Sequence, residues 1–531
     1  MDLQAGFAVY EIGLRWFHRM SCLNHHLSYI FMNLNLWLRP KSLWALCFLG
    51  CSALAGQDVS LREDVTSLSV VHERLLGDRI ARDLYRDPDY LDDAPIADYL
   101  HSIWQHLMNA ARQRGDIPAE LDAGFAWKLL QGKDRTVNAF ALPGGYFGIH
   151  LGLVGVVSSK DELASVLAHE LSHVTQRHIA RLISRQSEQT PLLVGAMILG
   201  ALAASTNPAG ANAVIVGGQA VAAQSQLNFS RDMEREADRA GFEVATRAGF
   251  SPVAFVSMFE KLQLTNRNND AGSFPYLRSH PLTTERIADM KSRIPDGMDK
   301  VPSCSLEHSM VSARARLLSN ASVDGLRNWY SEAESAALSK LTPCQRVGAL
   351  YGSMLASIKL RDFGRAVGYR DALRLLVAND DAGMRQWRYV SAELALAEGR
   401  PAAALEALAQ EASPKSRAEL LTWVDTQTRL GSADAASDAA QLWVLEHPLD
   451  ASMWQALASA RAAQGRTVAA VRAEAEVNFA QLDYAGAIAR LKAAQELSKS
   501  KLAPGDHIEA SIVDVRLRQV EQLLREQAIE R

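Results

Sequence analysis

The segment AHELSHVTQRH, residues 168–178, places three histidines and one glutamate close together. His169 and His173 are four residues apart, so on a helix both imidazoles project from one face and can bind one metal ion. Glu170 is rotated by about 100° from His169, which keeps it off the ligand direction but within reach of a metal-bound water. This is the H-E-x-x-H spacing, in which the histidines bind zinc and the glutamate acts as general base.

His178 lies nine residues after His169, which is about half a turn away on a continuous helix. We predict such a helix over residues 160–186, with Ser158 or Ser159 as its N-cap. His178 then cannot bind the same ion, and we expect a structural role for it.

A catalytic zinc ion needs three protein ligands and one open position. Glu234 and Asp238 are four residues apart in a second predicted helix, residues 229–249. One carboxylate can bind the ion while the other holds an imidazole in the correct tautomer. Glu234 is the best third ligand, and Glu236, off that face, is the weaker candidate. The alternative is a solvated charged helix face.

Several elements must position these side chains. Residues 60–115 repeat apolar side chains every three or four positions and predict helices. Residues 124–157 contain β-favouring runs separated by turn residues and predict a small sheet. The apolar stretches 191–204 and 209–224 are too short to span a bilayer. We expect a buried helical hairpin there, the alternative being a surface that touches substrate or membrane.

Beyond residue 305 the chain changes to alanine-rich helices separated by short turns. Spacings of 35, 32 and 34 residues separate four turn glycines: Gly364, Gly399, Gly431 and Gly465. A period near 34 predicts tetratricopeptide-like hairpins stacked into an α-solenoid. Residues 478–491 fit the same template 17 residues after the last turn, which suggests a terminal unit out of strict register. The alternative is a nonrepetitive helical bundle.

The N-terminal part has the layout of an export signal. Two basic residues, Arg39 and Lys41, precede an apolar run over residues 43–49, and small residues allow cleavage after Ala55. Met32 would give a more typical signal length, so we expect the natural start to be later than Met1. Lipid attachment at Cys51 is the alternative.

Cleavage after Ala55 would leave two cysteines, Cys304 and Cys344. In an exported protein they can form a disulfide or remain two thiols. Closing this loop would stabilise the fold by roughly 4 kcal/mol on the chain-entropy model.

Composition restricts the function classes. The chain has 531 residues, 48% hydrophobic and 22% charged, with a formal net charge of -4. The length suggests more than one globular domain. The charge argues against nucleic-acid binding through a bulk positive field.

Four ordered segments together resemble a known family: VNAFALPGGYFGIHLGLV (137–154), AHELSHVTQRH (168–178), FSRDMEREAD (229–238) and RSHPLTTERI (278–287). They are similar to the gluzincin zinc metalloproteases that include the CAAX prenyl endopeptidases. With an export signal and C-terminal repeats, the chain resembles the periplasmic members of this family that act on outer-membrane β-barrel proteins.

The resemblance implies a role for each matching residue. One zinc ion would be bound by His169, His173 and Glu234, with Glu170 as catalytic base. The family treats the residue matching Asp238 as a proton donor, whereas helical geometry favours an orienting role. His280 would occupy the open zinc position and restrain activity, or would lie with Arg286 near the reacting carbonyl. The alternative for His280 is a capped surface histidine.

The segment NAFALPGG would form an edge strand beside the cleft, where an extended substrate can pair through its main chain. Asn138, Ala139 and Phe140 are the predicted substrate contacts. The alternative is a hairpin strand ending at the turn 143–145.

We therefore expect a mainly α fold with a small sheet. Residues 1–55 would hold the extension and signal peptide, 56–300 an α+β zincin-type metalloprotease domain, and 305–531 the tetratricopeptide-like α-solenoid. The expected function is a periplasmic zinc endopeptidase with chaperone-like activity in quality control of outer-membrane proteins. By resemblance, its substrates are unfolded or misassembled β-barrel proteins, and the repeats bind the β-barrel assembly machinery; peripheral membrane contact is a further expectation.

Two other classes remain open. One is mainly a chaperone or adaptor with rare, gated proteolysis, and the other is a zinc-stabilised scaffold without turnover.

Overall fold

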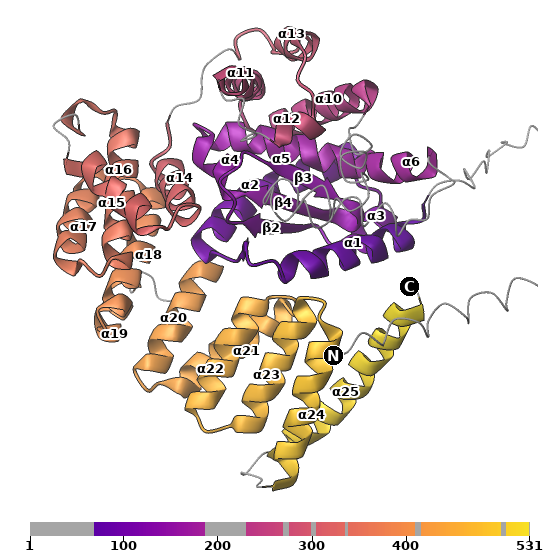
Figure 1. The fold of residues 1–531 in the computed structure, drawn as a ribbon, viewed down its shortest axis with the longest axis vertical. Coiled ribbons are helices and arrows are strands. Elements are labelled where there is room, and N and C mark those ends of the chain that lie inside the picture. Colours follow the sequence, from indigo (N-terminus) through magenta and orange to yellow (C-terminus); the bar gives the residue numbers. More distant parts are fainter. Residues whose placement is uncertain are drawn as a thin grey trace, which may run out of the picture. The chain divides into compact units, whose positions relative to one another are not determined.

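The computed structural model describes residues 68–185, 230–268, 275–298, 304–334, 338–408, 416–500 and 506–529. These residues form many helices and one four-stranded sheet, so the predicted mainly α fold with a small sheet is confirmed (Figure 1). The expected export signal, Met32, Cys51 and the apolar stretches 191–204 and 209–224 lie outside the described residues. Within the described ranges, no helix combines the length and apolar character needed to cross a membrane.

Two helices form in this part of the chain, as expected, and the short strand β1 (Tyr90–Leu91) lies between them. α1 (Val70–Tyr85) and α2 (Ala94–Arg114) begin at Ser69 and Asp93, whose side chains accept backbone hydrogen bonds from the first turn. α2 ends at Gly115, which has a left-handed φ of 82° that suits glycine. The buried face of α2 belongs to the main hydrophobic core.

The sheet has the strand order β1-β2-β4-β3. β1 (Tyr90–Leu91), β2 (Lys128–Gly132) and β4 (Tyr146–His150) follow one another in space, and β3 (Ala139–Leu142) forms the edge. β2 and β4 are parallel, whereas β3 and β4 are antiparallel across the turn Pro143–Gly145. Gly144 and Gly145 have φ values of 70° and 79°, which explains the glycines in this turn. All of β4 is buried. Because β3 is the last strand in the order, one side of its backbone forms an edge of the sheet.

The single long helix predicted over residues 160–186 is wrong, because the chain forms two helices. α5 (Lys160–Thr175) begins at the N-cap Ser159, and α6 (His178–Arg185) follows after a break. Arg177 lies in this break with a left-handed φ of 53°, which is unfavourable for a residue with a side chain. Its guanidinium pairs with the buried carboxylate of Glu73 at 2.9 Å. A contact with a distant part of the chain thus offsets the local cost.

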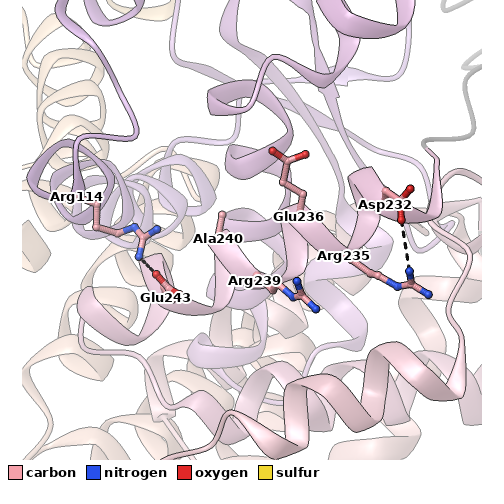
Figure 2. Close-up of a pocket in the computed structure, with 7 residues that line it drawn as sticks. All are labelled: Arg114, Asp232, Arg235, Glu236, Arg239, Ala240 and Glu243. Carbon is pink, nitrogen blue, oxygen red and sulfur yellow. Dashed lines mark hydrogen bonds and ion pairs between the residues drawn. The ribbon is translucent and has the colours of Figure 1, made fainter.

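α10 (Arg231–Arg247) packs against α5 and carries the second group of predicted site residues. A Cβ on Gly241 would lie 3.0 Å from the backbone of Ala168, so glycine allows this close approach. The outer face of α10 is charged, and Glu243 pairs there with Arg114 of α2 (Figure 2).

Five further helices complete the part of the fold that surrounds the site. They are α3 (Ala119–Gly124), α4 (Leu151–Val156), α11 (Pro252–Asn268), α12 (Tyr276–Ser279) and α13 (Thr284–Ser292).

The remaining helices form the predicted helical repeat region, in which successive helices pack against one another. They are α14 (Leu306–Leu318), α15 (Val323–Glu334), α16 (Pro343–Lys359), α17 (Phe363–Val377), α18 (Asp381–Ala397), α19 (Pro401–Leu408), α20 (Arg417–Arg429), α21 (Ala433–Glu446), α22 (Ala451–Ala463), α23 (Thr467–Ala480), α24 (Tyr484–Ser500) and α25 (Asp506–Ile529).

Three of the four predicted turn glycines lie at left-handed turns between helices: Gly399, Gly431 and Gly465. Gly364 was assigned wrongly, because it lies inside α17 and Arg361, with φ of 59°, takes the left-handed position. The 17-residue offset of the last unit also has a simple origin. Leu482 turns the chain at the other end of α23, so the offset equals one helix and its turn.

Arginines of the repeat region bind the acidic start of α2. Arg314 of α14 pairs with Asp93 at 2.8 Å, and Arg417 of α20 donates to Asp92 at 3.0 Å. The described residues, from 68 to 529, accordingly belong to one compact unit.

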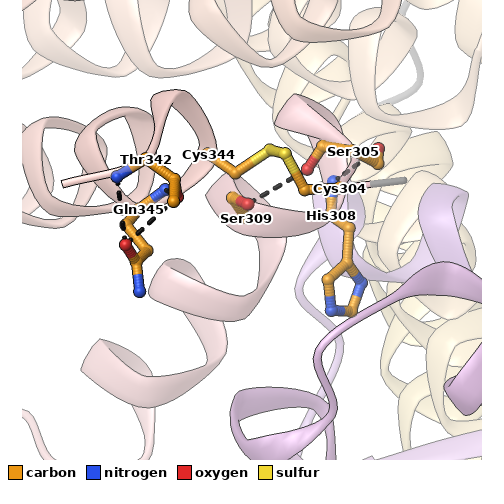
Figure 3. The surroundings of a disulfide bond; sticks show 7 residues. All are labelled: Cys304, Ser305, His308, Ser309, Thr342, Cys344 and Gln345. Carbon is orange, nitrogen blue, oxygen red and sulfur yellow. Dashed lines mark hydrogen bonds between the residues drawn. A yellow bond between two sulfur atoms is a disulfide. The ribbon is translucent and has the colours of Figure 1, made fainter. Parts of the chain in front are cut away.

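Cys304 and Cys344 form a disulfide, one of the two alternatives open from the sequence (Figure 3). Cys304 directly precedes Ser305, the N-cap of α14, and Cys344 lies in the first turn of α16. The bond therefore joins the starts of two packed helices.

Replacing both cysteines by serine should lower the free energy of unfolding by about 2–4 kcal/mol, because the unfolded chain regains loop entropy. Urea unfolding of the oxidised wild type and the double variant measures this loss. Reductant should destabilise the wild type and leave the variant unchanged. Equal unfolding of the oxidised and reduced wild type would contradict the prediction.

Candidate metal centre

Four side chains converge at the junction of α5, α10 and the residue after α12. They are His169 and His173 of α5, Glu234 of α10 and His280, and all four are buried. One ligand atom from each lies within 4.8 Å of the others. The structure thus brings together all four residues that the sequence suggested as metal ligands.

The separations of the ligand atoms suit a small tetrahedral ion. His169 Nε2 lies 3.0 Å from His173 Nε2 and 3.3 Å from His280 Nδ1. Glu234 Oε1 lies 3.5 Å from His173 Nε2. Tetrahedral bonds of about 2.0–2.1 Å require ligand atoms roughly 3.3 Å apart. Two or three imidazoles and a carboxylate therefore fit a metal ion of the zinc type.

Glu170 lies beside this group, on the side of β3. Its side chain is buried, and neither carboxylate oxygen has a hydrogen-bond partner of ordinary geometry among the described residues. The backbone N–H of Ala141 in β3 faces the carboxylate. Burial raises the pKa of Glu170 above its ordinary value, which makes the carboxylate a better proton acceptor. A buried carboxylate without a firm partner suits a base that bonds to water or substrate.

Asp238 is not one of the four ligand residues; it contacts the ligand His169 and the neighbouring Arg286. Its Oδ1 lies 3.0 Å from His169 Nδ1, and Arg286 donates to both its oxygens at 2.6 and 2.7 Å. Burial alone would raise the pKa of Asp238, but the hydrogen bonds from Arg286 lower it. This geometry is that of a carboxylate that orients a ligand histidine.

The side chain of Arg286, the N3 residue of α13, binds to the same cluster. Besides Asp238, it pairs with Glu234 Oε2 at 2.8 Å and donates to the carbonyl of Pro281 at 2.8 Å. It therefore links Glu234 and Asp238 of α10 to the segment that carries His280.

His280 is buried, so the alternative of a capped surface histidine is wrong. Its Nδ1 lies 3.0 Å from Glu234 Oε1, and its Nε2 lies 3.4 Å from Glu170 Oε1. The ring stacks on Tyr276 with centroids 4.7 Å apart. His280 thus contacts both the ligand residue Glu234 and the candidate base Glu170.

Sequence reasoning missed one contact to the ligand group. Because the helix breaks after α5, His178 turns back and its Nδ1 lies 2.8 Å from His173 Nδ1. Its Nε2 lies 3.1 Å from Glu236 Oε2. Burial lowers the pKa of His178 to about 4, so the ring is neutral near pH 7. The sequence held one clue: each motif left one residue without an assigned partner, His178 in the first and Glu236 in the second.

The three predicted substrate contacts lie at the start of the edge strand. Asn138 and Ala139 are buried, whereas Phe140 is partly exposed. Tyr276 donates its backbone N–H to the carbonyl of Val137 at 3.4 Å. The edge strand therefore begins next to the segment that carries His280.

A buried ligand set of helix-borne histidines and a carboxylate, with a buried glutamate beside it, is the arrangement of a metallopeptidase site. The comparison with known families agrees with this class. Residues 97–294 match the model of peptidase family M48, so this part of the chain is similar to the metallopeptidases of that family. The predicted metallopeptidase class is therefore confirmed.

Several relatives share this domain. The beta-barrel assembly-enhancing protease of Escherichia coli is 27% identical over 423 residues, 79% of this chain and 83% of its own length. A relative from Vibrio cholerae is 30% identical over 304 residues, 57% of this chain and 60% of its own length. The mitochondrial metalloendopeptidase OMA1 of Saccharomyces cerevisiae is 28% identical over 265 residues, 47% of this chain and 73% of its own length.

Asp238→Ala should weaken metal binding by roughly 10–100-fold, because His169 loses the group that orients it. The buried Arg286 would keep only its contacts with Glu234 and Pro281, and the loss of Asp238 should also lower the free energy of unfolding by about 3 kcal/mol. Chelator competition and urea unfolding measure the two effects. Asp232→Ala, on the same helix but 92% exposed, is the control and should change neither. Unchanged metal affinity in Asp238→Ala would contradict the orienting role.

Proposed function

We propose that this chain is a zinc-dependent endopeptidase whose general base is Glu170. The observation that carries the proposal is the buried group of His169, His173 and Glu234 with the buried Glu170 carboxylate beside it, whose oxygens make no hydrogen bond of ordinary geometry among the described residues. The peptidase domain spans residues 56–300 and the repeat domain residues 305–531. Zinc bound by these three ligands would polarise the scissile carbonyl and acidify a water molecule.

Glu170 accepts the proton of the attacking water and transfers it to the leaving amine. Its raised pKa favours the uptake, and its position next to Ala141 places it beside the edge strand. Asp238 keeps the Nδ1 of His169 engaged and so directs Nε2 toward the ion. In this proposal Asp238 orients a ligand and is not the proton donor.

The substrate is an extended peptide that pairs with β3 through main-chain hydrogen bonds. Ala139 contributes backbone groups, because its side chain is buried, and Phe140 contributes its partly exposed ring. The Asn138 carbonyl already accepts a hydrogen bond from the His150 N–H at 3.0 Å, so Asn138 fixes the start of the strand beside the substrate. Main-chain recognition tolerates many side chains, which suits unfolded polypeptides as substrates.

In the resting enzyme His280 would hold the fourth position of a bound ion. The support is the 3.3 Å distance from its Nδ1 to His169 Nε2 and the 3.0 Å distance to Glu234 Oε1. Water and substrate then reach the ion only after His280 moves away. This arrangement also favours the second candidate function, a chaperone or adaptor in which proteolysis is rare and gated.

The proposed cellular role is quality control of outer-membrane β-barrel proteins in the periplasm. It rests on the names of the Escherichia coli and Yersinia pestis relatives, both beta-barrel assembly-enhancing proteases. Unfolded or misassembled β-barrel proteins are the substrates, and the repeat domain binds the barrel-assembly machinery.

Glu170→Gln should retain metal binding but lose at least about 100-fold in casein cleavage, because the amide cannot accept the proton. Cleavage by the purified protein and metal content measure these effects, and a chelator should abolish wild-type cleavage. Full cleavage by Glu170→Gln would exclude the proposed base. If the variant still restores barrel assembly in a deletion strain, binding rather than cleavage carries that role.

His280→Ala should raise the rate of casein cleavage several-fold, because the fourth position opens to water and substrate. The double variant with Glu170→Gln is the control and should be inactive. A lower rate in His280→Ala would instead assign the histidine to stabilising the reacting carbonyl. An unchanged rate would exclude both roles.

A further inference from the structure

In each of the two histidine ligands of α5, the ring nitrogen Nδ1 contacts another side chain, and this partner differs between the two histidines. His169 is held by Asp238 at its Nδ1. His173 presents Nε2 to the ligand group, 3.0 Å from His169 Nε2, so its Nδ1 is directed away from the ion position. That Nδ1 meets the Nδ1 of His178 at 2.8 Å.

Two facing ring nitrogens at this distance share one proton. The hydrogen bond between His178 and Glu236 decides which of the two rings carries that proton. Glu236 Oε2 lies 3.1 Å from His178 Nε2, and a carboxylate can only accept a hydrogen bond. His178 therefore carries its proton on Nε2, which leaves its Nδ1 as an acceptor. His173 must then donate from Nδ1, which leaves its Nε2 lone pair free for a metal ion.

Glu236 is fixed in turn by Arg181 of α6, whose Nη1 lies 2.9 Å from the same oxygen. The Glu236 side chain points away from Arg235 and Arg239 on α10 (Figure 2). The break between α5 and α6 is what brings His178 to this carboxylate.

We propose that His178 and Glu236 are positioning residues that hold His173 in its metal-binding tautomer and orientation. The inference rests on the proposed zinc site. A merely structural contact between α6 and α10 would affect stability and leave zinc affinity unchanged, so zinc affinity is the decisive readout.

The test measures the zinc dissociation constant of the full chain by chelator competition, together with urea unfolding of the zinc-free protein. Glu236→Ala is the main variant, because this side chain is 39% exposed and its loss leaves the core intact. Glu243→Ala is the matched control: the same residue type on the same helix, paired with Arg114 and 53% exposed. His178→Ala removes the direct partner of His173.

We expect Glu236→Ala to weaken zinc binding by about 10-fold and His178→Ala by about 10–100-fold. Glu236→Gln should stay within about threefold of the wild type, because its amide oxygen still accepts from His178. Glu243→Ala should bind zinc like the wild type. Unfolding of the zinc-free Glu236→Ala protein should match that of Glu243→Ala.

The possible failures are distinguishable. A wild type that binds no stoichiometric zinc overturns both the proposed function and this inference. A wild type that binds zinc and cleaves casein, with Glu236→Ala within about twofold in zinc affinity, overturns this inference alone. Equal losses in Glu236→Ala and Glu243→Ala also overturn it, because they reveal a general effect on α10.

Discussion

The ion pair between Arg286 and Asp238 is the interaction on which the candidate metal centre depends. Its two hydrogen bonds join α13 to α10, and Asp238 extends the link to His169 on α5. Arg286 also binds Glu234 and the carbonyl next to His280. Because all these groups are buried, each carboxylate needs a partner, and removing one partner costs several kcal/mol. The Arg286 guanidinium thereby fixes the side chains of Glu234 and Asp238 and links α13, α10 and α5.

The close packing of α5 on α10 is the second requirement, because ligands from two helices must meet within a few ångströms. Gly241 permits that approach beside His169. On its other side α5 contacts β3, which sets Glu170 against the edge strand. The same helix therefore carries the metal ligands toward α10 and the base toward the strand. This explains why a small sheet is needed in a mainly helical domain.

Helical periodicity predicted that His169 shares a face with His173, and Glu234 with Asp238. The need of a catalytic zinc ion for a third protein ligand then joined the two pairs into one predicted cluster. Periodicity could not predict the break between α5 and α6, because no glycine or proline marks it. The left-handed Arg177 is stabilised by Glu73, 104 residues earlier in the chain. Gly364 was misassigned for a related reason, since Arg361 takes the turn position. Periodicity also gave no information on how His280 approaches the ligands, because that depends on the packing of α12 and α13.

The anchors of the site suggest how a gate can open without dismantling the metal centre. The contacts that hold His169 and Glu234 come from Asp238 and Arg286, and neither runs through the imidazole of His280. If His280 moves away, His169, His173 and Glu234 keep their contacts with Asp238, His178 and Arg286, respectively. A closed state favoured by only about 2.7 kcal/mol would already account for 99% of the molecules. A substrate strand that pairs with β3 could supply such an energy, because β3 begins beside the Tyr276–His280 segment. Substrate binding and gate opening would then be one coupled equilibrium.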